Sequence, residues 1–276
     1  MGAGSIRLAL TGAALALASC SAPVAERPQS EAPTFVSLNP CIDAILVETA
    51  APDQVLALSH YSRDPASSSM DVAQAARFGV TGGTAEEVIA LQPDIVLAGT
   101  FIAPATRAAL ERAGMQVETF GSPASVEESI EQVQRLATLT GQPDRGAQLA
   151  QTLLSSEPPQ AAGYSALLWQ PGEIVAGASS LVSAHLAWAE LSNHAAAQGL
   201  EQADRVSIEQ VLSDPPDILL VAGDAPGQLH PLLETLESTH VAQFDPSLFY
   251  CAGPSIPKAR ERLAQIVGAA REAKNR

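Results

Sequence analysis

Two stretches of the chain repeat one pattern of residues. Residues 86–97 read EEVIALQPDIVL and residues 209–220 read EQVLSDPPDILL, so each copy has a Glu seven positions before a Pro-Asp-Ile sequence. A unit that recurs within one chain indicates duplicated supersecondary structure, so we expect two related lobes. Two lobes that are joined once leave a cleft between them, and clefts are where small molecules bind.

Each copy predicts a helix that is followed by a buried strand. In the first copy Val88 and Leu91 fall on one face at helical spacing, and Pro93 ends the helix because it has no amide hydrogen to donate. Residues 95–98 and 218–222 are short, continuous apolar runs, each with a Gly directly after it. Such runs are typical of parallel strands that are covered by helices on both faces.

Glu86 and Glu209 occupy matching places at the start of these two helices. A carboxylate is favoured there because the amino end of a helix carries partial positive charge. Helix capping is therefore enough to explain either Glu alone. Because the acid is present in both copies, the pair also predicts a surface that docks a partner at two points.

The first part of the chain has the form of a bacterial export signal. Residues 8–18 are apolar, follow an arginine and are too few to span a bilayer. They lead into the tetrapeptide LASC, which resembles the lipobox of bacterial lipoproteins, so we expect residues 1–19 to be a signal peptide and Cys20 to be acylated. An ordinary signal peptide followed by an unrelated Cys is the alternative. Residues 20–33 are rich in Pro, Glu and Ser and predict a flexible tether.

Two further cysteines, Cys41 and Cys251, lie near opposite ends of the folded region. The compartment outside the cytoplasmic membrane is oxidising, so a disulfide between them is permitted there. The sequence does not establish that their Cα atoms come close enough for a bond. Two buried free thiols are the alternative.

Strands alternate with helices through the folded part of the chain. This alternation predicts an α/β fold with parallel sheets. The expected strands of the first lobe are residues 34–38, 55–58, 95–98 and 115–120, and its helices outside the repeat are residues 41–49 and 104–113. The second lobe is expected to open with a strand at 165–169, to carry a helix at 181–191 and to end with a helix at 256–272.

Helical sequence separates the two lobes. Ser125 and Glu128 form a capping box that starts one helix. A second helix, from residue 143 to about residue 156, is the candidate for a single rigid connector, and two prolines stop it. The predicted organisation is an N-terminal α/β lobe at residues 34–140, a connecting helix at 141–160 and a C-terminal α/β lobe at 161–276.

Charge and motif content exclude several classes of function. The net charge is −15 and no basic cluster could follow a phosphate backbone, so nucleic acid is not expected as a partner. The His residues show no zinc-ligand spacing, and no metal site is predicted. The sequence lacks a GxSxG elbow, an HExxH helix and a phosphate-binding loop, so we do not expect an enzyme. An envelope lipoprotein that acts as a hydrolase or a scaffold is the alternative from another class.

A candidate ligand site follows from the rule that ligands of open α/β sheets sit beyond the carboxyl ends of the strands. Eight polar or aromatic side chains are expected in that region: His60, Tyr61, Arg63, Phe101, Trp169, Gln170, Phe249 and Tyr250. Most of them also have a plainer interpretation. Tyr61, Tyr250, Trp169 and Phe249 can be core, His60 can be a hydrogen-bonding loop residue, and Arg63 can pair with its neighbour Asp64.

From Thr34 to its end the chain resembles the substrate-binding proteins of ABC importers for iron-siderophores, haem and cobalamin, the type whose lobes are joined by a helix. The motifs that carry the resemblance are VSLNP at residues 36–40, the two repeats with their Pro-Asp strands, NHAA at 193–196, and Gly253-Pro254. The resemblance implies two Rossmann-like lobes with parallel sheets, a single connecting helix and a ligand cleft between the lobes. It also implies a monomer in the periplasm, whose Glu86 and Glu209 dock basic pockets on the ABC permease subunits.

The resemblance also bears on the ligand. Tyr61 occupies the place of a ligand-stacking aromatic in the cobalamin-binding branch, but Leu248 and Cys251 stand where that branch has Trp and Arg. The turn at residues 169–171 and the helix start at 179–181 are more similar to iron-complex binders. A ferric siderophore is therefore the first expectation, with cobalamin or haem in the same role as alternatives. The metal chelate is cargo in this interpretation, and no cofactor is expected.

Overall fold

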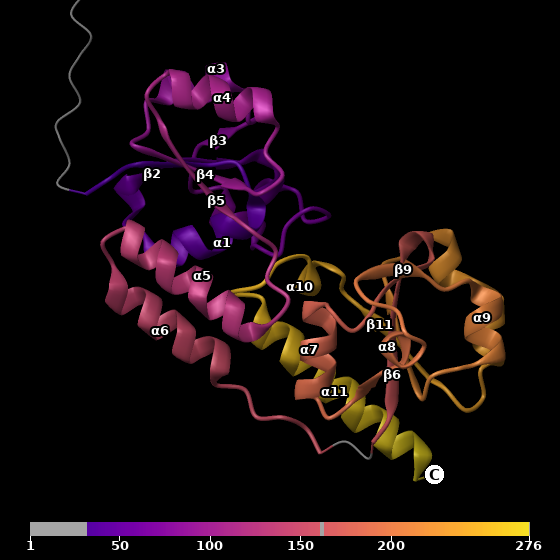
Figure 1. Ribbon diagram of the computed structural model, residues 1–276. Coiled ribbons are helices and arrows are strands. Elements are labelled where there is room, and N and C mark those ends of the chain that lie inside the picture. The colour runs from indigo at the N-terminus through magenta and orange to yellow at the C-terminus, as the bar shows by residue number, and fades with distance from the viewer. Residues whose placement is uncertain (1–31, 161–162, 276) are drawn as a thin grey trace, which may run out of the picture. The chain divides into compact units, whose positions relative to one another are not determined.

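The computed structural model describes residues 32–160 and 163–275, which belong to one compact unit (Figure 1). The expected signal peptide, Cys20 and the tether up to residue 31 lie outside the described residues. Among the described helices, none has the length and apolar character that a membrane span requires.

The first lobe is built on a sheet of five parallel strands in the order β3-β2-β1-β4-β5. The strands are β1 (Phe35–Ser37), β2 (Val55–Ser59), β3 (Val80–Thr81), β4 (Ile95–Gly99) and β5 (Gln116–Phe120). Strand β1 lies in the centre, where Phe35 is paired with Ile95 of β4. The predicted parallel sheet is confirmed, and β3 is a short strand that the sequence did not indicate.

Helices cover both faces of this sheet (Figure 1). The helices are α1 (Pro40–Thr49), α5 (Val126–Leu139) and α6 (Pro143–Leu154) on one face, α3 (Ala85–Leu91) and α4 (Pro104–Arg112) on the other, and the short α2 (Val72–Ala75). Side chains alternate along β1, so Phe35 packs in the core with α1 and α5, whereas Val36 packs with Val88 of α3 and Leu110 of α4. All four side chains are fully buried.

The second lobe has a mixed sheet in the order β11-β10-β6-β7-β9, with β8 beside β6. Its strands are β6 (Ser165–Gln170), β7 (Ile174–Ala176), β8 (Ser192–Asn193), β9 (Ala203–Arg205), β10 (Ile218–Ala222) and β11 (His240–Phe244). Strands β6, β8, β10 and β11 run parallel, as predicted, and β7 adds antiparallel pairings with β6 and with β9 that the sequence did not indicate. The reason is local: Gly172 and Glu173 both adopt positive φ, and this tight turn folds β7 back onto β6.

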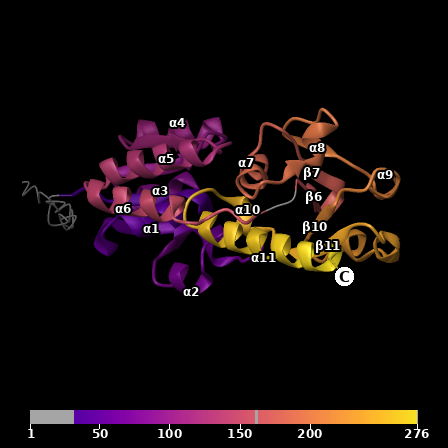
Figure 2. The ribbon, with the colours of Figure 1, turned by 90° about the horizontal axis from the view of Figure 1, so that it is seen from below.

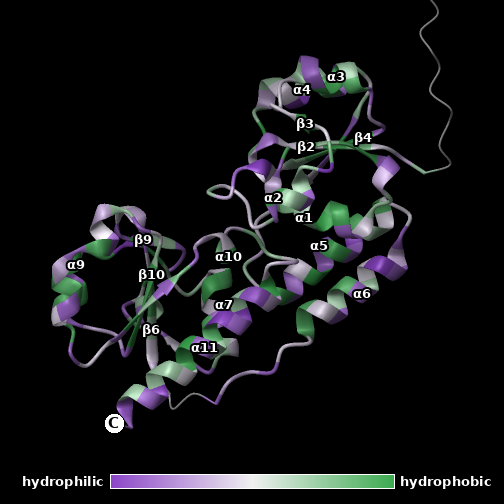
Figure 3. Ribbon diagram, turned by 180° about the vertical axis from the view of Figure 1, so that it is seen from behind, coloured by the Kyte–Doolittle hydropathy of each residue, from purple (hydrophilic) through white to green (hydrophobic). Residues whose placement is uncertain are grey.

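The helices of the second lobe are α7 (Leu181–Trp188), α8 (His194–Ala197), α9 (Ile208–Ser213), α10 (Ser247–Tyr250) and α11 (Ile256–Lys274). Two cores pack against this sheet, one on each face. Leu168 of β6 and Leu220 of β10 pack in one of them with Leu186 of α7 and Leu263 of α11, and the neighbouring positions along both strands pack in the second. Figure 3 shows the hydrophobic residues gathered in α7 and in the strands around β10. Figure 2 shows α11 running from α10 to the C-terminus beside this sheet, which it contacts at β11.

The Pro-Asp-Ile repeat has the same structural role in both lobes. Asp94 Oδ2 accepts hydrogen bonds from the amide and the hydroxyl of Thr34, both at 2.8 Å, and Thr34 Oγ1 accepts one from the Asp94 amide at 3.2 Å. Asp217 Oδ2 accepts from the Ser165 amide at 2.8 Å and its hydroxyl at 2.9 Å, and Ser165 Oγ accepts from the Asp217 amide at 2.9 Å. Each Asp therefore ties the start of its own strand to the start of the central strand beside it.

The connection between the lobes is helical only in part. Helix α6 ends at Leu154, so the helix predicted for residues 141–160 is shorter, and residues 155–160 have no regular structure. Helix α6 stays with the first lobe because it packs closely on α5: a Cβ added at Gly146 would lie 2.4 Å from the Ala137 Cβ. The end of α6 is held by Arg260 of α11, whose guanidinium donates to the Leu153 carbonyl at 2.9 Å.

Candidate functional site

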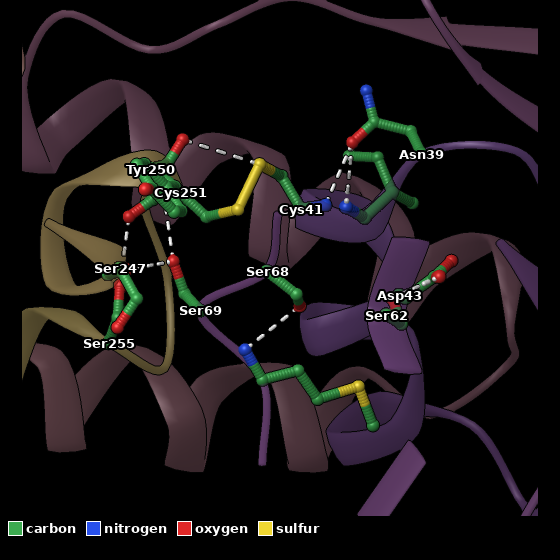
Figure 4. Close-up of a disulfide and its surroundings, with 12 residues drawn as sticks. Asn39, Cys41, Asp43, Ser62, Ser68, Ser69, Ser247, Tyr250, Cys251 and Ser255 are labelled. Carbon is green, nitrogen blue, oxygen red and sulfur yellow. Dashed lines mark hydrogen bonds between the residues drawn. A yellow bond between two sulfur atoms is a disulfide. The ribbon is translucent and has the colours of Figure 1, made fainter. Parts of the chain in front are cut away.

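A disulfide between Cys41 and Cys251 brings the carboxyl ends of strands from the two sheets together (Figure 4). Cys41 lies in the first turn of α1, directly after β1, and Cys251 follows α10, which comes after β11. Their Cα atoms are 5.0 Å apart. Of the two alternatives that the sequence left open for these cysteines, the structure therefore has the bond.

A hydrogen-bonded serine reinforces this junction. Ser69 comes from the loop after β2, and its hydroxyl donates to the Ser247 carbonyl. The same oxygen accepts a hydrogen bond from the Cys251 amide at 3.1 Å, as Figure 4 shows. The segments that follow β1, β2 and β11 therefore meet, which places the expected ligand region of the first lobe beside that of the second.

The VSLNP motif explains how Cys41 is positioned. Asn39 is the N-cap of α1, and its Oδ1 accepts hydrogen bonds from the Cys41 amide at 2.8 Å and the Ile42 amide at 3.4 Å. Pro40 occupies the first helical position, where its missing amide hydrogen costs nothing. The motif therefore starts a helix directly at the strand end and directs Cys41 toward the second lobe.

Asp43 holds the segment that carries Tyr61. It is completely buried in α1, and its Oδ2 accepts hydrogen bonds from the Ser59 amide at 2.8 Å and from the Ser62 hydroxyl at 2.6 Å. These two residues flank Tyr61 in the turn His60–Arg63. Burial raises the pKa of Asp43 to about 7, and the hydrogen bonds offset only part of this effect. The sequence had not singled out this residue.

The raised pKa predicts how stability depends on pH. The contribution of Asp43 is fully present below its unfolded pKa of 3.8 and is lost as the pH rises toward about 7, because only the folded state keeps the proton. Between pH 5 and pH 8 the wild-type protein should lose unfolding free energy as Asp43 ionises. The Asp43→Asn variant has a neutral side chain at both pH values, so its loss over this range should be smaller by about 2 kcal/mol. Urea unfolding of both proteins at the two pH values measures it. Identical pH dependence in the two proteins would show that Asp43 does not titrate in this range.

Three exposed aromatic side chains lie at the carboxyl ends of strands. The chain has six Phe, two Trp and three Tyr. Of these only Tyr61, Phe101 and Tyr250 are exposed, at 49%, 95% and 42% of their surface. Tyr61 follows β2, Phe101 follows β4 and Tyr250 follows β11. Because ligands of open α/β sheets sit beyond the carboxyl ends of the strands, these three side chains are the candidates for ligand contact.

The polar residues of the β2 loop are held by the neighbouring strand end. The His60 ring lies 4.0 Å from the Tyr61 ring, and its Nδ1 is 3.3 Å from the Thr81 carbonyl oxygen at the end of β3. Arg63 donates to the Phe78 carbonyl at 2.6 Å rather than to Asp64. The loop is therefore braced against the segment around β3 and presents the Tyr61 ring to solvent.

Three other residues of the expected site lie further inside. Trp169 is 1% exposed and packs in the core of the second lobe, where its indole donates to the Val206 carbonyl at 2.9 Å. Of its two interpretations, Trp169 therefore has the plainer one and is a core residue, because β6 is covered on both faces up to that position. Phe249 is half-buried and stacks on Phe244 at 4.5 Å. Gln170 ends β6 opposite Ile174 and is half-buried.

A small cavity of about 140 Å³ lies next to the disulfide. The start of α1 and the β5–α5 loop line it from the first lobe, and Leu181 and the segment 249–252 line it from the second. Ligand pockets are usually about 300–1,000 Å³, so this cavity is smaller than a typical ligand site. Tyr250 lines the cavity and is also one of the three exposed aromatic residues.

Comparison with known proteins identifies the family. Residues 35–243 match the family model of the periplasmic binding proteins. The chain belongs to this family. Its members bind solutes for transport, so the protein is a binding protein and not an enzyme. Among curated protein sequences the chain has no significant match.

Solved structures of periplasmic binding proteins share the fold. A possible iron-binding solute-binding protein from Staphylococcus epidermidis is similar with a TM-score of 0.70 at 16% identity, over 86% of this chain and 99% of that one. The vitamin B12 binding protein of Vibrio cholerae has a TM-score of 0.65 at 19% identity, over 87% and 98%. A haem-binding protein from Roseiflexus in its apo form has a TM-score of 0.64 at 20% identity, and the match covers 88% of this chain and 99% of that one. The expected two-lobed α/β fold of ABC importer binding proteins is confirmed.

The two glutamates of the repeat are exposed in this periplasmic binding protein. Glu86 lies in the first turn of α3, whose N-cap is Thr84, and Glu209 lies in the first turn of α9, whose N-cap is Ser207. The Ser207 hydroxyl lowers the pKa of Glu209, so this carboxyl is charged at neutral pH. Other residues are the N-caps of both helices, and each Glu lies in the first turn, where the amino end of the helix favours a carboxylate.

Within residues 32–160 and 163–275, no three His, Cys, Asp or Glu side chains are grouped so that they could hold a metal ion. The dispersed His residues include His185, which is fully buried beside Phe249 at 5.2 Å between ring centroids. Burial lowers the pKa of His185 to about 4, with a smaller effect from Arg260, so this ring is neutral at physiological pH.

Proposed function

We propose that this protein is the substrate-binding lipoprotein of an ABC importer and that it captures a ferric-siderophore-type iron complex for delivery to the membrane permease. Cobalamin or haem in the same role are the alternatives. The observation that carries the proposal is the set of three exposed aromatic side chains, Tyr61, Phe101 and Tyr250, at the strand ends of both lobes.

Aromatic faces suit the ligands of this family because a metal chelate presents a broad, partly apolar surface. Covering it removes both the chelate and the side chains from water, and each ring can also contact a cationic centre. Similar structures are described as iron-binding, haem-binding and vitamin B12 binding proteins, which supports a chelate as the class of ligand. Capture requires no bond to form or break, in accord with a binding protein.

The leader supports export to the periplasm and attachment to a membrane. In this proposal Cys20 carries the lipid and residues 20–33 link it to the folded lobes. Several acyl chains give stable anchoring where a single chain would not. Mass spectrometry of the N-terminal peptide from membranes tests this part, since an unmodified Cys20 or a different mature terminus contradicts it.

Native mass spectrometry of protein purified from its own periplasm, together with its visible spectrum, tests the class of ligand. We expect a bound mass that contains iron and a charge-transfer absorption of a ferric chelate. A Soret band would replace this expectation with haem, and corrin bands would replace it with cobalamin. Hydrolytic turnover of ester or peptide substrates would contradict the role of a binding protein.

The permease is proposed to bind the two exposed acids of the repeat. We expect the double substitution Glu86→Ala and Glu209→Ala to leave ligand affinity unchanged and to reduce uptake at least about 10-fold, because charge pairs at interfaces fix orientation and register. Uptake of labelled ligand by cells that express the variant measures the effect.

The matched control replaces two exposed glutamates on other helices, Glu131 of α5 and Glu261 of α11. It removes the same net charge and should transport normally. Normal uptake by the Glu86→Ala, Glu209→Ala protein, or an equal loss in the control, would remove the docking model.

A further inference from the structure

We propose that the disulfide between Cys41 and Cys251 is a reducible latch, which holds the short helix α10 and its Tyr250 ring on the first lobe. A protein dithiol outside the cytoplasm opens this latch while both lobes stay folded. The role goes beyond solute capture and is independent of which solute the protein binds. It follows from the exposure of Cys41, from the few other contacts of α10, and from the anchored segment that follows Cys251.

The two cysteines of the bond differ in exposure. Cys41 lies in the first turn of α1 and is half-buried, whereas Cys251 is 3% exposed. Both line the cavity of about 140 Å³, so the bond faces open space on one side rather than packed core. Access decides which sulfur atom an incoming thiolate attacks, so the attack takes place at Cys41.

The exchange that opens the latch has two steps. A thiolate of the dithiol attacks Cys41 Sγ, the bond between the two cysteines breaks, and the Cys251 sulfur leaves as a thiolate that takes up a proton. The second thiol of the dithiol then attacks the first one, forms the dithiol's own disulfide and releases Cys41 as a thiolate. The positive amino end of α1, a helix of ten residues, stabilises this leaving group. The dithiol is thus oxidised to a disulfide, and the cysteine pair is reduced to two thiols.

Helix α10 has few contacts that keep it in place without the bond. It is a single turn of four residues, none of them fully buried, and so short a helix is not stable by itself. Its own lobe holds it through Leu248 and Phe249, which pack against the core of that lobe. The first lobe holds it through the disulfide, through Ser69 and through Cys41 Sγ, which lies 3.5 Å from the Tyr250 carbonyl oxygen (Figure 4).

The chain directly after Cys251 is anchored in the first lobe. Ala252 and Ile256 are buried in the core that contains Ile45 of α1. Gly253 adopts a φ of +100°, and a Cβ at this position would lie 3.1 Å from Ile45 Cγ1, so the two segments are in close contact. These contacts do not involve the disulfide. Opening is therefore confined to α10, and Cys251 stays near its partner, so that the bond can form again.

Opening the latch changes the placement of Tyr250. Its ring is exposed and comes from the second lobe, and the neighbouring bond at Cys251 fixes this residue against α1. Without the bond, α10 samples more arrangements. A partner that contacts the Tyr250 ring then has to order these residues again, which costs conformational entropy. Reduction therefore weakens contact at Tyr250 without removing the ring.

Reduction kinetics of the purified, folded protein test the access of a dithiol to the bond. Dithiothreitol is the probe, and mass spectrometry of alkylated peptides identifies the free thiols after quenching. We expect Cys41 and Cys251 to be reduced at a rate proportional to the dithiothreitol concentration, while circular dichroism shows no loss of structure. A rate that does not change with the dithiothreitol concentration would mean that reduction waits for unfolding, and it would overturn the latch.

Hydrogen exchange of the oxidised and the reduced protein tests where the latch acts. At the earliest time points the peptide that covers residues 247–251 should exchange at least about 10-fold faster after reduction, while β4 and β10 stay protected in both states. The variant Cys41→Ser, Cys251→Ser should exchange like the reduced wild-type protein with or without dithiothreitol. The control Ser69→Ala keeps the disulfide, so its exchange should still respond to dithiothreitol.

Two results of the exchange experiment contradict the latch. Unchanged exchange at residues 247–251 after reduction would show that other contacts fix α10. Faster exchange throughout both lobes at the same time points would show that the bond stabilises the fold as a whole rather than α10. Neither result concerns solute binding, so the proposed function stands or falls separately, on the mass and the visible spectrum of the bound ligand.

Discussion

Replacing Cys41 and Cys251 together by Ser is expected to lower the free energy of unfolding by about 3–5 kcal/mol. The bond joins residues 210 positions apart, so it constrains nearly the whole folded chain in the unfolded state. Loop-closure entropy grows with the length of the loop, which places this disulfide toward the upper end of the usual range. Cys251 is also buried, so the variant exchanges a sulfur contact for a hydroxyl in an apolar setting.

Urea unfolding with and without reductant measures this contribution. Dithiothreitol should lower the unfolding free energy of the wild-type protein by as much as the double substitution lowers it without reductant. The unfolding free energy of the double variant should not change when reductant is added. Ser69→Ala is a useful comparison, since it removes the other link at the same junction and should cost about 1 kcal/mol. A double variant as stable as the oxidised wild type would show that the junction is held by other contacts.

The sequence predicted the elements that depend on local patterns. Strand β4 and strand β10 were placed by continuous apolar runs that end in Gly, and helix α1 was placed by Asn39 and Pro40, which start it in the structure. These signals are strong because they arise from burial on both faces and from satisfied helix ends, which any such element needs.

Features that depend on distant partners were not predicted. The Asp of the Pro-Asp-Ile repeat reads as a strand start, and only the structure shows that Asp94 and Asp217 bind Thr34 and Ser165 on the adjacent strand. Strands β7 and β9 are short and carry no alternating pattern. The helix of the connector was expected to end at about residue 156 because two prolines follow, and it ends at Leu154, so the rest of the segment assigned to the connector is not helical.

The candidate site was predicted in part, since position after a strand does not determine exposure. Tyr61, Phe101 and Tyr250 are exposed, whereas Trp169 is buried although it also stands at the end of a strand. The difference is that Trp169 is inside β6 and is paired with Val175 of β7, while the other three lie beyond their strands. A periodicity argument could not separate these cases because β7 folds back unexpectedly.

The exposed aromatic rings should carry most of the ligand affinity. Replacing Tyr61, Phe101 and Tyr250 together by Ala is expected to weaken ligand binding about 100-fold or more, because aromatic side chains dominate the energy of binding surfaces. Phe101 is almost fully exposed and the two Tyr side chains are about half exposed, so the unfolding free energy should fall by less than the core substitution Trp169→Ala costs. Trp169→Ala should do the reverse, since it removes core packing and leaves the ligand surface in place.

We expect a metal chelate to bind against these three rings, which lie beyond the carboxyl ends of β2, β4 and β11. The direct test is a calorimetric titration of the wild-type protein and the Tyr61→Ala, Phe101→Ala, Tyr250→Ala variant with the chelate that the periplasmic protein carries. We expect the dissociation constant of the folded variant to be about 100-fold higher than that of the wild-type protein. An unchanged dissociation constant in a correctly folded variant would contradict it.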